Sequence, residues 1–128
     1  MHFHEQVHNR AVQKAANPSS WSTEEMVTYR AYSLHSYIEC DGLDGGIANL
    51  EPGVARLSLP ALKTLGLTEL ADELARFLDY FEWVECETPE QTDAHFAFCD
   101  QTLRKLEELG LNDIPRILEA HLQQQRLN

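Results

Sequence analysis

The feature that most limits the fold of this chain is a helix stop followed at once by a helix start, and it occurs twice. Residues 65–70 read Leu-Gly-Leu-Thr-Glu-Leu, and residues 109–114 read Leu-Gly-Leu-Asn-Asp-Ile. Glycine adopts the left-handed backbone that closes a helix, and a small polar residue with an acidic neighbour suits the start of the next one. The pattern predicts two helix hairpins of similar local design. A solenoid would need about three copies.

Further helix boundaries follow from capping boxes and prolines. Ser22 with Glu25, and Thr88 with Gln91, have the spacing at which two side chains satisfy each other's free amides at a helix start, and Pro18 ends the preceding helix. Thr68 is expected to cap its helix. No strand pattern is present, so we predict a single all-α domain over 1–128, an antiparallel bundle of about six helices. The expected helices are 3–16, 22 to about 40, 58–66, 69 to about 87, 88–109 and about 112 onwards, with a short helical turn at 47–50.

The segment from Asp41 to Gly46 contains three glycines in five positions. Glycine favours turn and left-handed backbone and weakens a helix. We therefore expect Gly42, Gly45 and Gly46 to form a tight, non-helical connector between two helices.

The formal net charge of −11 is concentrated in the middle of the chain. Between Glu39 and Asp100 there are fourteen acidic residues, against only Arg56, Lys63 and Arg76. Such a field repels phosphates, so we expect no direct binding to nucleic acid or to an anionic membrane. A basic protein is the partner that this charge favours.

Other features suggest an intracellular protein without a cofactor. The N-terminal residues lack the basic start and apolar run of a secretory signal, and no window reaches the roughly 18 apolar residues of a membrane helix, so we expect a cytoplasmic location. Cys40, Cys86 and Cys99 are widely spaced and odd in number, which favours reduced, mostly buried thiols.

His4-Glu5-Gln6-Val7-His8 matches the H-E-x-x-H pattern of zinc peptidases. Two histidines one helical turn apart can bind zinc, but only three residues precede the pattern, where such enzymes have a sheet and a substrate cleft. We keep a zinc-dependent peptidase as a minor alternative and regard His4 and His8 as weak metal candidates. The main expectation is a protein without enzymatic activity.

Residues 37–49 (YIECDGLDGGIAN), 59–66 (LPALKTLG) and 71–81 resemble the bacterial DNA-mimic protein family, with similarity over residues 29–82. In that family a helix ends in an acidic residue and a Gly-Gly turn, and a short helix then reaches an asparagine; Ile47 stands here at an aromatic position. The resemblance implies a helical acidic protein, in some cases a homodimer. Its carboxylates replace DNA phosphates on a DNA-binding protein such as a transcription regulator.

The function expected from charge and resemblance together is an acidic binding protein that occupies the basic surface of a nucleic-acid-binding protein. The alternative is an immunity protein that neutralises a cognate toxin, for example a nuclease. The carboxylates expected to form the partner-binding surface are Asp41, Asp44, Glu51, Glu69, Asp72, Glu73, Asp79, Glu82 and Glu85.

Overall fold

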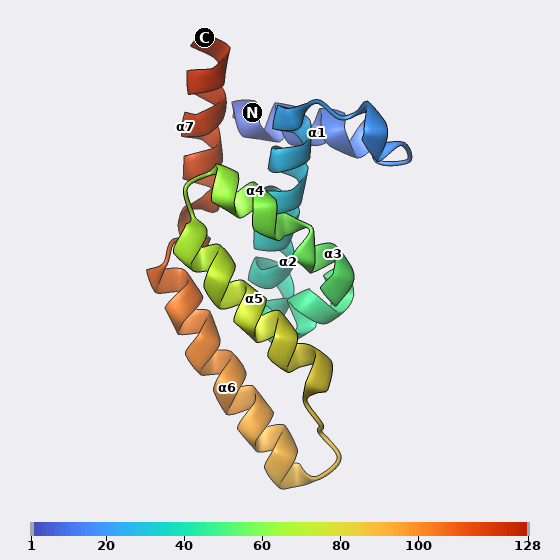
Figure 1. Ribbon diagram of the computed structural model, residues 1–128, viewed down its shortest axis with the longest axis vertical. Helices are drawn as coiled ribbons and strands as arrows, with labels where there is room; N and C mark the ends of the chain where they lie inside the picture. The colour runs from blue at the N-terminus through green and yellow to red at the C-terminus, as the bar shows by residue number, and fades with distance from the viewer. Residues whose placement is uncertain (1, 128) are drawn as a thin grey trace.

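The computed structural model describes residues 2–127, with the side chains of residues 2–126. All regular structure in this range is helical, which confirms the predicted all-α class (Figure 1). In chain order the elements are α1 (Phe3–Gln13), the 3-10 turn η1 (Pro18–Ser20), α2 (Thr23–Leu50), α3 (Pro52–Arg56), α4 (Ser58–Thr64), α5 (Thr68–Trp83), α6 (Pro89–Glu108), the 3-10 turn η2 (Leu111–Asp113) and α7 (Ile114–Leu127).

Helices α5 and α6 run antiparallel, and α1 lies across the start of α2 (Figure 1). The two ends of the chain lie at one end of the molecule, and the α5–α6 connection lies at the other. The core follows the length of α2 and α5, where Leu34, Ile47, Leu74 and Phe77 are almost completely buried. The bundle is therefore elongated, with one end formed by a single helix hairpin.

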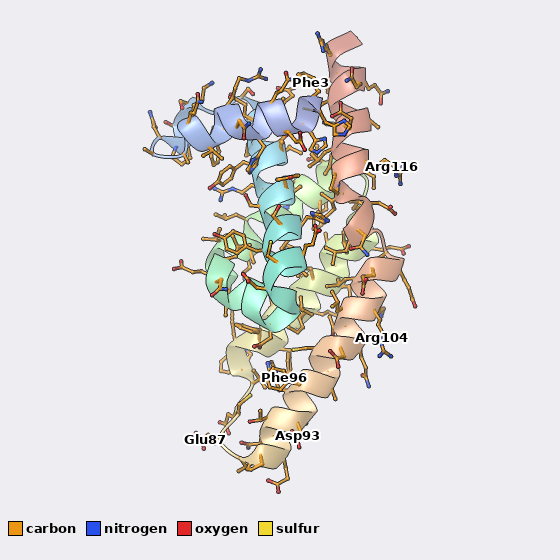
Figure 2. The ribbon with its side chains drawn as sticks, turned by 180° about the vertical axis from the view of Figure 1, so that it is seen from behind. Phe3, Glu87, Asp93, Phe96, Arg104 and Arg116 are labelled. Atoms are coloured by element: carbon orange, nitrogen blue, oxygen red, sulfur yellow. The ribbon has the colours of Figure 1, made fainter. Side chains whose placement is uncertain are left out.

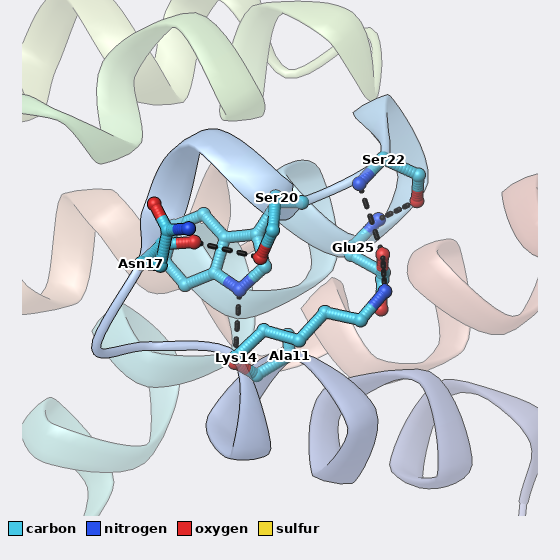
Figure 3. Close-up of polar contacts among 7 residues, drawn as sticks. Ala11, Lys14, Asn17, Ser20, Ser22 and Glu25 are labelled. Carbon is cyan, nitrogen blue, oxygen red and sulfur yellow. Dashed lines mark hydrogen bonds and ion pairs between the residues drawn. The ribbon is translucent and has the colours of Figure 1, made fainter.

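Polar contacts fix the corner between α1 and α2, and Figure 3 draws seven of the residues that take part. The predicted capping box is confirmed: Glu25 N–H donates to Ser22 Oγ (3.1 Å), and Ser22 N–H donates to Glu25 Oε1 (2.9 Å). Lys14 Nζ also donates to Glu25 Oε1 at 2.9 Å, and Trp21 Nε1 donates to the Ala11 carbonyl at 2.8 Å. These contacts turn the chain sharply, and α1 ends at Gln13, three residues earlier than expected.

The predicted glycine connector is wrong in extent. Only Gly42 leaves the helical backbone (φ 77°, ψ 178°), and helix resumes immediately, so α2 is two helical pieces joined by a one-residue kink. Gly45 and Gly46 lie inside the second piece. At Gly46 an added Cβ would lie 2.7 Å from the Tyr37 carbonyl oxygen, so this glycine lets the second piece pack directly on the backbone of the first.

Both predicted glycine helix stops are confirmed. Gly66 and Gly110 have φ of 80° and 111°, the left-handed region in which glycine is favoured. After Gly66, the Leu67 N–H donates to the Leu62 carbonyl at 2.9 Å, the bond that closes a helix at a left-handed residue. The predicted Thr68 cap is wrong, because Leu67 occupies the N-cap position and α5 begins at Thr68 without a side-chain cap.

Helix α5 ends at Trp83, although the sequence pattern predicts an end near Glu87. The cause is the start of α6, where the predicted Thr88–Gln91 capping box forms. Gln91 Oε1 accepts from the N–H groups of both Thr88 (3.1 Å) and Glu87 (2.8 Å), and Pro89 disfavours a helical residue before it. The chain is therefore extended from Val84, and Glu85 and Glu87 lie on a loop.

Candidate functional site

The α5–α6 end of the molecule is acidic because residues 77–103 include no lysine or arginine. Figure 2 shows Glu87 and Asp93 at this end, whereas Arg116 lies in the other half of the molecule. Five carboxylates of this segment are exposed and make no ion pair with any residue that the structure describes. We call them the acidic end: Glu85, Glu87, Glu90, Asp93 and Asp100.

Four of these five were not among the carboxylates expected to bind a partner. Glu90, Asp93 and Asp100 lie on one face of α6, because separations of three and seven residues return to nearly the same side of a helix. Glu87 lies just before this helix. The absence of basic residues over residues 77–103 was the sequence signal that could have identified them.

Asp79 and Glu82, two of the expected residues, are paired within the protein. Arg56 Nη2 lies 2.7 Å from Asp79 Oδ1, and Arg56 Nε donates to Glu82 Oε1 at 3.0 Å. These hydrogen bonds raise the pKa of Arg56. The Arg56 guanidinium therefore compensates one of the two negative charges of this carboxylate pair.

Glu73 was expected to point outward, and this is wrong. Its side chain is only 12% exposed and lies between α5 and α6, where Arg76 Nη2 (2.5 Å) and Lys105 Nζ (3.2 Å) contact it. The hydrogen bond from Arg76, supported by Lys105, lowers the pKa of the Glu73 carboxyl. Glu73 therefore joins two helices, and little of it is accessible to a partner.

The two aspartates at the α2 kink also form hydrogen bonds within the protein. Asp44 Oδ1 lies 2.5 Å from Nε2 of the buried His95, and Asp41 accepts a hydrogen bond from the Asn49 amide at 3.0 Å. The remaining expected residues are exposed without an ion pair in the described chain: Glu51, Glu69, Asp72 and Glu85. Glu69 and Asp72 begin α5, whereas Glu85 follows its end, so the expected set does not form one patch.

The acidic end also exposes aromatic side chains. Trp83 is 82% exposed at the last residue of α5, and Phe96 on α6 is 51% exposed. Large apolar side chains among charged ones are typical of residues that anchor protein–protein contacts. Tyr80, by contrast, is half-buried and hydrogen-bonded to His95.

His95 is the centre of a buried polar cluster. Its Nδ1 atom lies 2.7 Å from the Tyr80 hydroxyl, its Nε2 atom contacts Asp44, and Cys99 Sγ lies 3.6 Å from Nε2. Burial raises the pKa of Tyr80. Burial and the nearby Asp44 carboxylate raise the pKa of Cys99 to about 11. Both groups are therefore protonated at neutral pH.

The N-terminal histidines serve structural contacts. His4 is buried, and its backbone N–H and ring Nδ1 both lie 2.9 Å from Glu119 Oε1 on α7. His8 stacks on Tyr29, and burial, together with His4, lowers its pKa. Glu5 caps α1 by accepting from the His2 N–H at 3.0 Å. Among the residues described, His4 and His8 belong to no group of three potential metal ligands.

The expectation of mostly buried cysteines is wrong: Cys40 and Cys86 are exposed, and only Cys99 is buried. All three thiols are free.

In the described part of the chain, no helix has the length and apolar character needed to cross a membrane. No family model, curated protein or solved structure matches the chain.

Proposed function

We propose that this protein is a non-enzymatic binding protein whose acidic end occupies the basic surface of a DNA-binding protein. The observation that carries the proposal is the set of exposed, unpaired carboxylates at the α5–α6 end within a segment that has no lysine or arginine. A surface of one sign attracts partners of the other sign and speeds their association.

The spacing of these carboxylates supports mimicry of DNA in particular. Side chains three, four and seven residues apart on a helix lie roughly 5–10 Å from one another, which overlaps the spacing of phosphates along a DNA strand. Glu90 and Asp93 on α6 have such a separation, and Asp100 continues the row after seven more residues. The resemblance of residues 29–82 to DNA-mimic proteins points in the same direction.

Trp83 supports a protein partner. An indole that is 82% exposed beside several carboxylates can bury much apolar area at a protein interface while the charges set orientation and rate. We therefore assign the energetic centre of the contact to Trp83 and the electrostatic attraction to the acidic end.

The proposal is tested by capturing proteins from a lysate of the source organism at low salt, with the chain immobilised through its N-terminus, which lies far from the acidic end. We expect a DNA-binding protein that duplex DNA releases and that high salt also releases. The Glu85→Gln/Glu87→Gln/Glu90→Gln variant should capture much less of it.

Two other results would change the assignment. Capture of a toxin whose activity the protein blocks, without competition by DNA, would favour an immunity protein. Equal capture of the same proteins by the wild type and by the triple variant would contradict any role of the acidic end.

A further inference from the structure

Asp44, His95 and Cys99 bring three potential metal-ligand atoms within 4.8 Å of one another. His95 and Cys99 are four residues apart on α6 and therefore lie on the same face of that helix. Asp44 comes from the second piece of α2, immediately after the kink at Gly42. Two helices thus contribute a carboxylate, an imidazole and a thiol to one position inside the molecule.

We propose that Asp44, His95 and Cys99 bind a divalent transition-metal cation of the zinc class. An imidazole and a thiolate with one carboxylate suit zinc better than magnesium or calcium, which prefer oxygen ligands alone. Three protein ligands leave the fourth tetrahedral position to water. None of these three ligands is among the five carboxylates of the acidic end.

The distances suit a tetrahedral ion. Metal–ligand bonds of about 2.0–2.3 Å hold the ligand atoms about 3.3–3.8 Å apart. The 3.6 Å between His95 Nε2 and Cys99 Sγ already has this length. The 2.5 Å between His95 Nε2 and Asp44 Oδ1 is a hydrogen bond, which the cation would replace as the two atoms move apart. Asp44 is 37% exposed at its side chain and adjoins the kink, so it has room for that movement.

Tyr80 is placed to position the His95 ring in both the metal-free and the metal-bound protein. In the metal-free protein, Nε2–H can donate to Asp44 while the Tyr80 hydroxyl donates to Nδ1. With a cation on Nε2, the ring proton stands on Nδ1, and the Tyr80 oxygen accepts from it. Binding also replaces the S–H bond of Cys99 by a sulfur–metal bond, and this thiol proton leaves to solvent.

A cavity of about 370 Å³ gives access to the cluster. Asp44 and Cys99 line it, together with Asp41 and Asp100, whose carboxylates add negative charge along the path. A cation would therefore be attracted towards the buried thiol. If the cluster were only a hydrogen-bond network that stabilises the fold, Asp44, His95 and Tyr80 would be sufficient. The sulfur of Cys99 could then be replaced by an oxygen.

The test is titration of the chelator-treated full-length chain with Co²⁺ and then Zn²⁺. Cobalt reports thiolate ligation through a sulfur-to-metal charge-transfer band, so histidine sites on the surface stay silent. We expect this band to saturate at one Co²⁺ per chain and to be displaced by Zn²⁺. Cys99→Ser should abolish the band, whereas Cys86→Ser and Cys40→Ser, which change exposed thiols, should retain it.

Asp44→Asn keeps the shape of the side chain and provides a second variant should Cys99→Ser fold poorly, as judged by circular dichroism. We expect it to weaken Zn²⁺ binding by at least about tenfold, since even outer-shell changes cost that much. Absence of the band in the wild type, its survival in Cys99→Ser, its loss in Cys86→Ser or unchanged Zn²⁺ affinity in Asp44→Asn would each overturn the proposal.

Discussion

The guanidinium of Arg56 on α3 binds the carboxylate of Asp79 on α5, with 2.7 Å between Nη2 and Oδ1. Because Arg56 also binds Glu82, it compensates part of the negative charge beside the acidic end. The acidic region that the sequence places between Glu39 and Asp100 is therefore divided in the fold. Its internally paired carboxylates hold helices together, and its unpaired ones remain free at the α5–α6 end.

Replacement of Arg56 by glutamine is expected to have opposite effects on stability and on binding. The Asp79 side chain is 70% exposed, so loss of the ion pair should cost less than about 1 kcal/mol in chemical denaturation. The freed carboxylates should strengthen binding of a basic partner at low salt by up to about fivefold. Weaker binding of the Arg56→Gln variant would mean that the arginine itself contacts the partner.

Trp83→Ala should separate binding from folding. Because the indole is 82% exposed, its removal should leave the thermal midpoint nearly unchanged, yet an anchor residue of this kind contributes about 2 kcal/mol or more, roughly a thirtyfold change in Kd. Leu57→Ala is the matched control, since Leu57 is also exposed, at 52%, but lies on the α3–α4 junction. Equal affinities of the two variants would exclude Trp83 as the anchor.

Two neighbouring glycines should respond oppositely to the same substitution. Gly46→Ala places a Cβ 2.7 Å from the Tyr37 carbonyl oxygen and should destabilise the fold by about 1–3 kcal/mol in urea denaturation. Gly45→Ala meets only Asp41 Cβ at 3.5 Å, an ordinary contact, and should be neutral or stabilise the helix by up to about 1 kcal/mol. A harmless Gly46→Ala change would contradict the close packing of the two pieces of α2.

Acid should weaken the contact between α1 and α7. Burial alone would raise the pKa of Glu119, but hydrogen bonds from the His4 N–H, Gln123 and the His4 ring outweigh it and lower the pKa from 4.5 to about 2. A lowered pKa means that the contribution of Glu119 to stability is present above pH 4.5 and is lost as the pH falls towards 2.

The Glu119→Gln variant should therefore lose about 1–3 kcal/mol at pH 6 and show a flatter stability curve between pH 4.5 and 2 than the wild type. Glu108→Gln, at an exposed carboxylate without an ion pair in the described chain, serves as control and should follow the wild-type curve. Parallel curves for Glu119→Gln and the wild type would show that the carboxylate contributes nothing specific to folding.

The helical class and most helix starts could be predicted from sequence because caps and glycine stops act locally. Ser22, Thr88, Gly66 and Gly110 behave as their neighbours in sequence indicate. Gly46 does not, because its role depends on the approach of the Tyr37 backbone, which is a tertiary contact.

The binding surface was harder to predict, since carboxylates of the same type have different partners in the fold. Glu73 and Asp72 are adjacent in sequence, yet Glu73 is mostly covered and paired with Arg76 and Lys105 while Asp72 is exposed. Similarly, His95 and Cys99 have helical spacing that indicates a shared face, but Asp44 joins them only because the chain kinks at Gly42. Long-range pairing of this kind leaves no local pattern.

The most direct measurement of the central claim is the salt dependence of Kd for the captured partner with two variants of equal net charge. Glu85→Gln/Glu87→Gln/Glu90→Gln neutralises three of the five carboxylates of the acidic end, and Glu69→Gln/Asp72→Asn/Glu108→Gln neutralises three exposed carboxylates elsewhere. The acidic-end variant should bind at least about tenfold more weakly at low salt and show a shallower salt dependence, while the other stays near wild type. Equal weakening of both variants would contradict a localised binding surface.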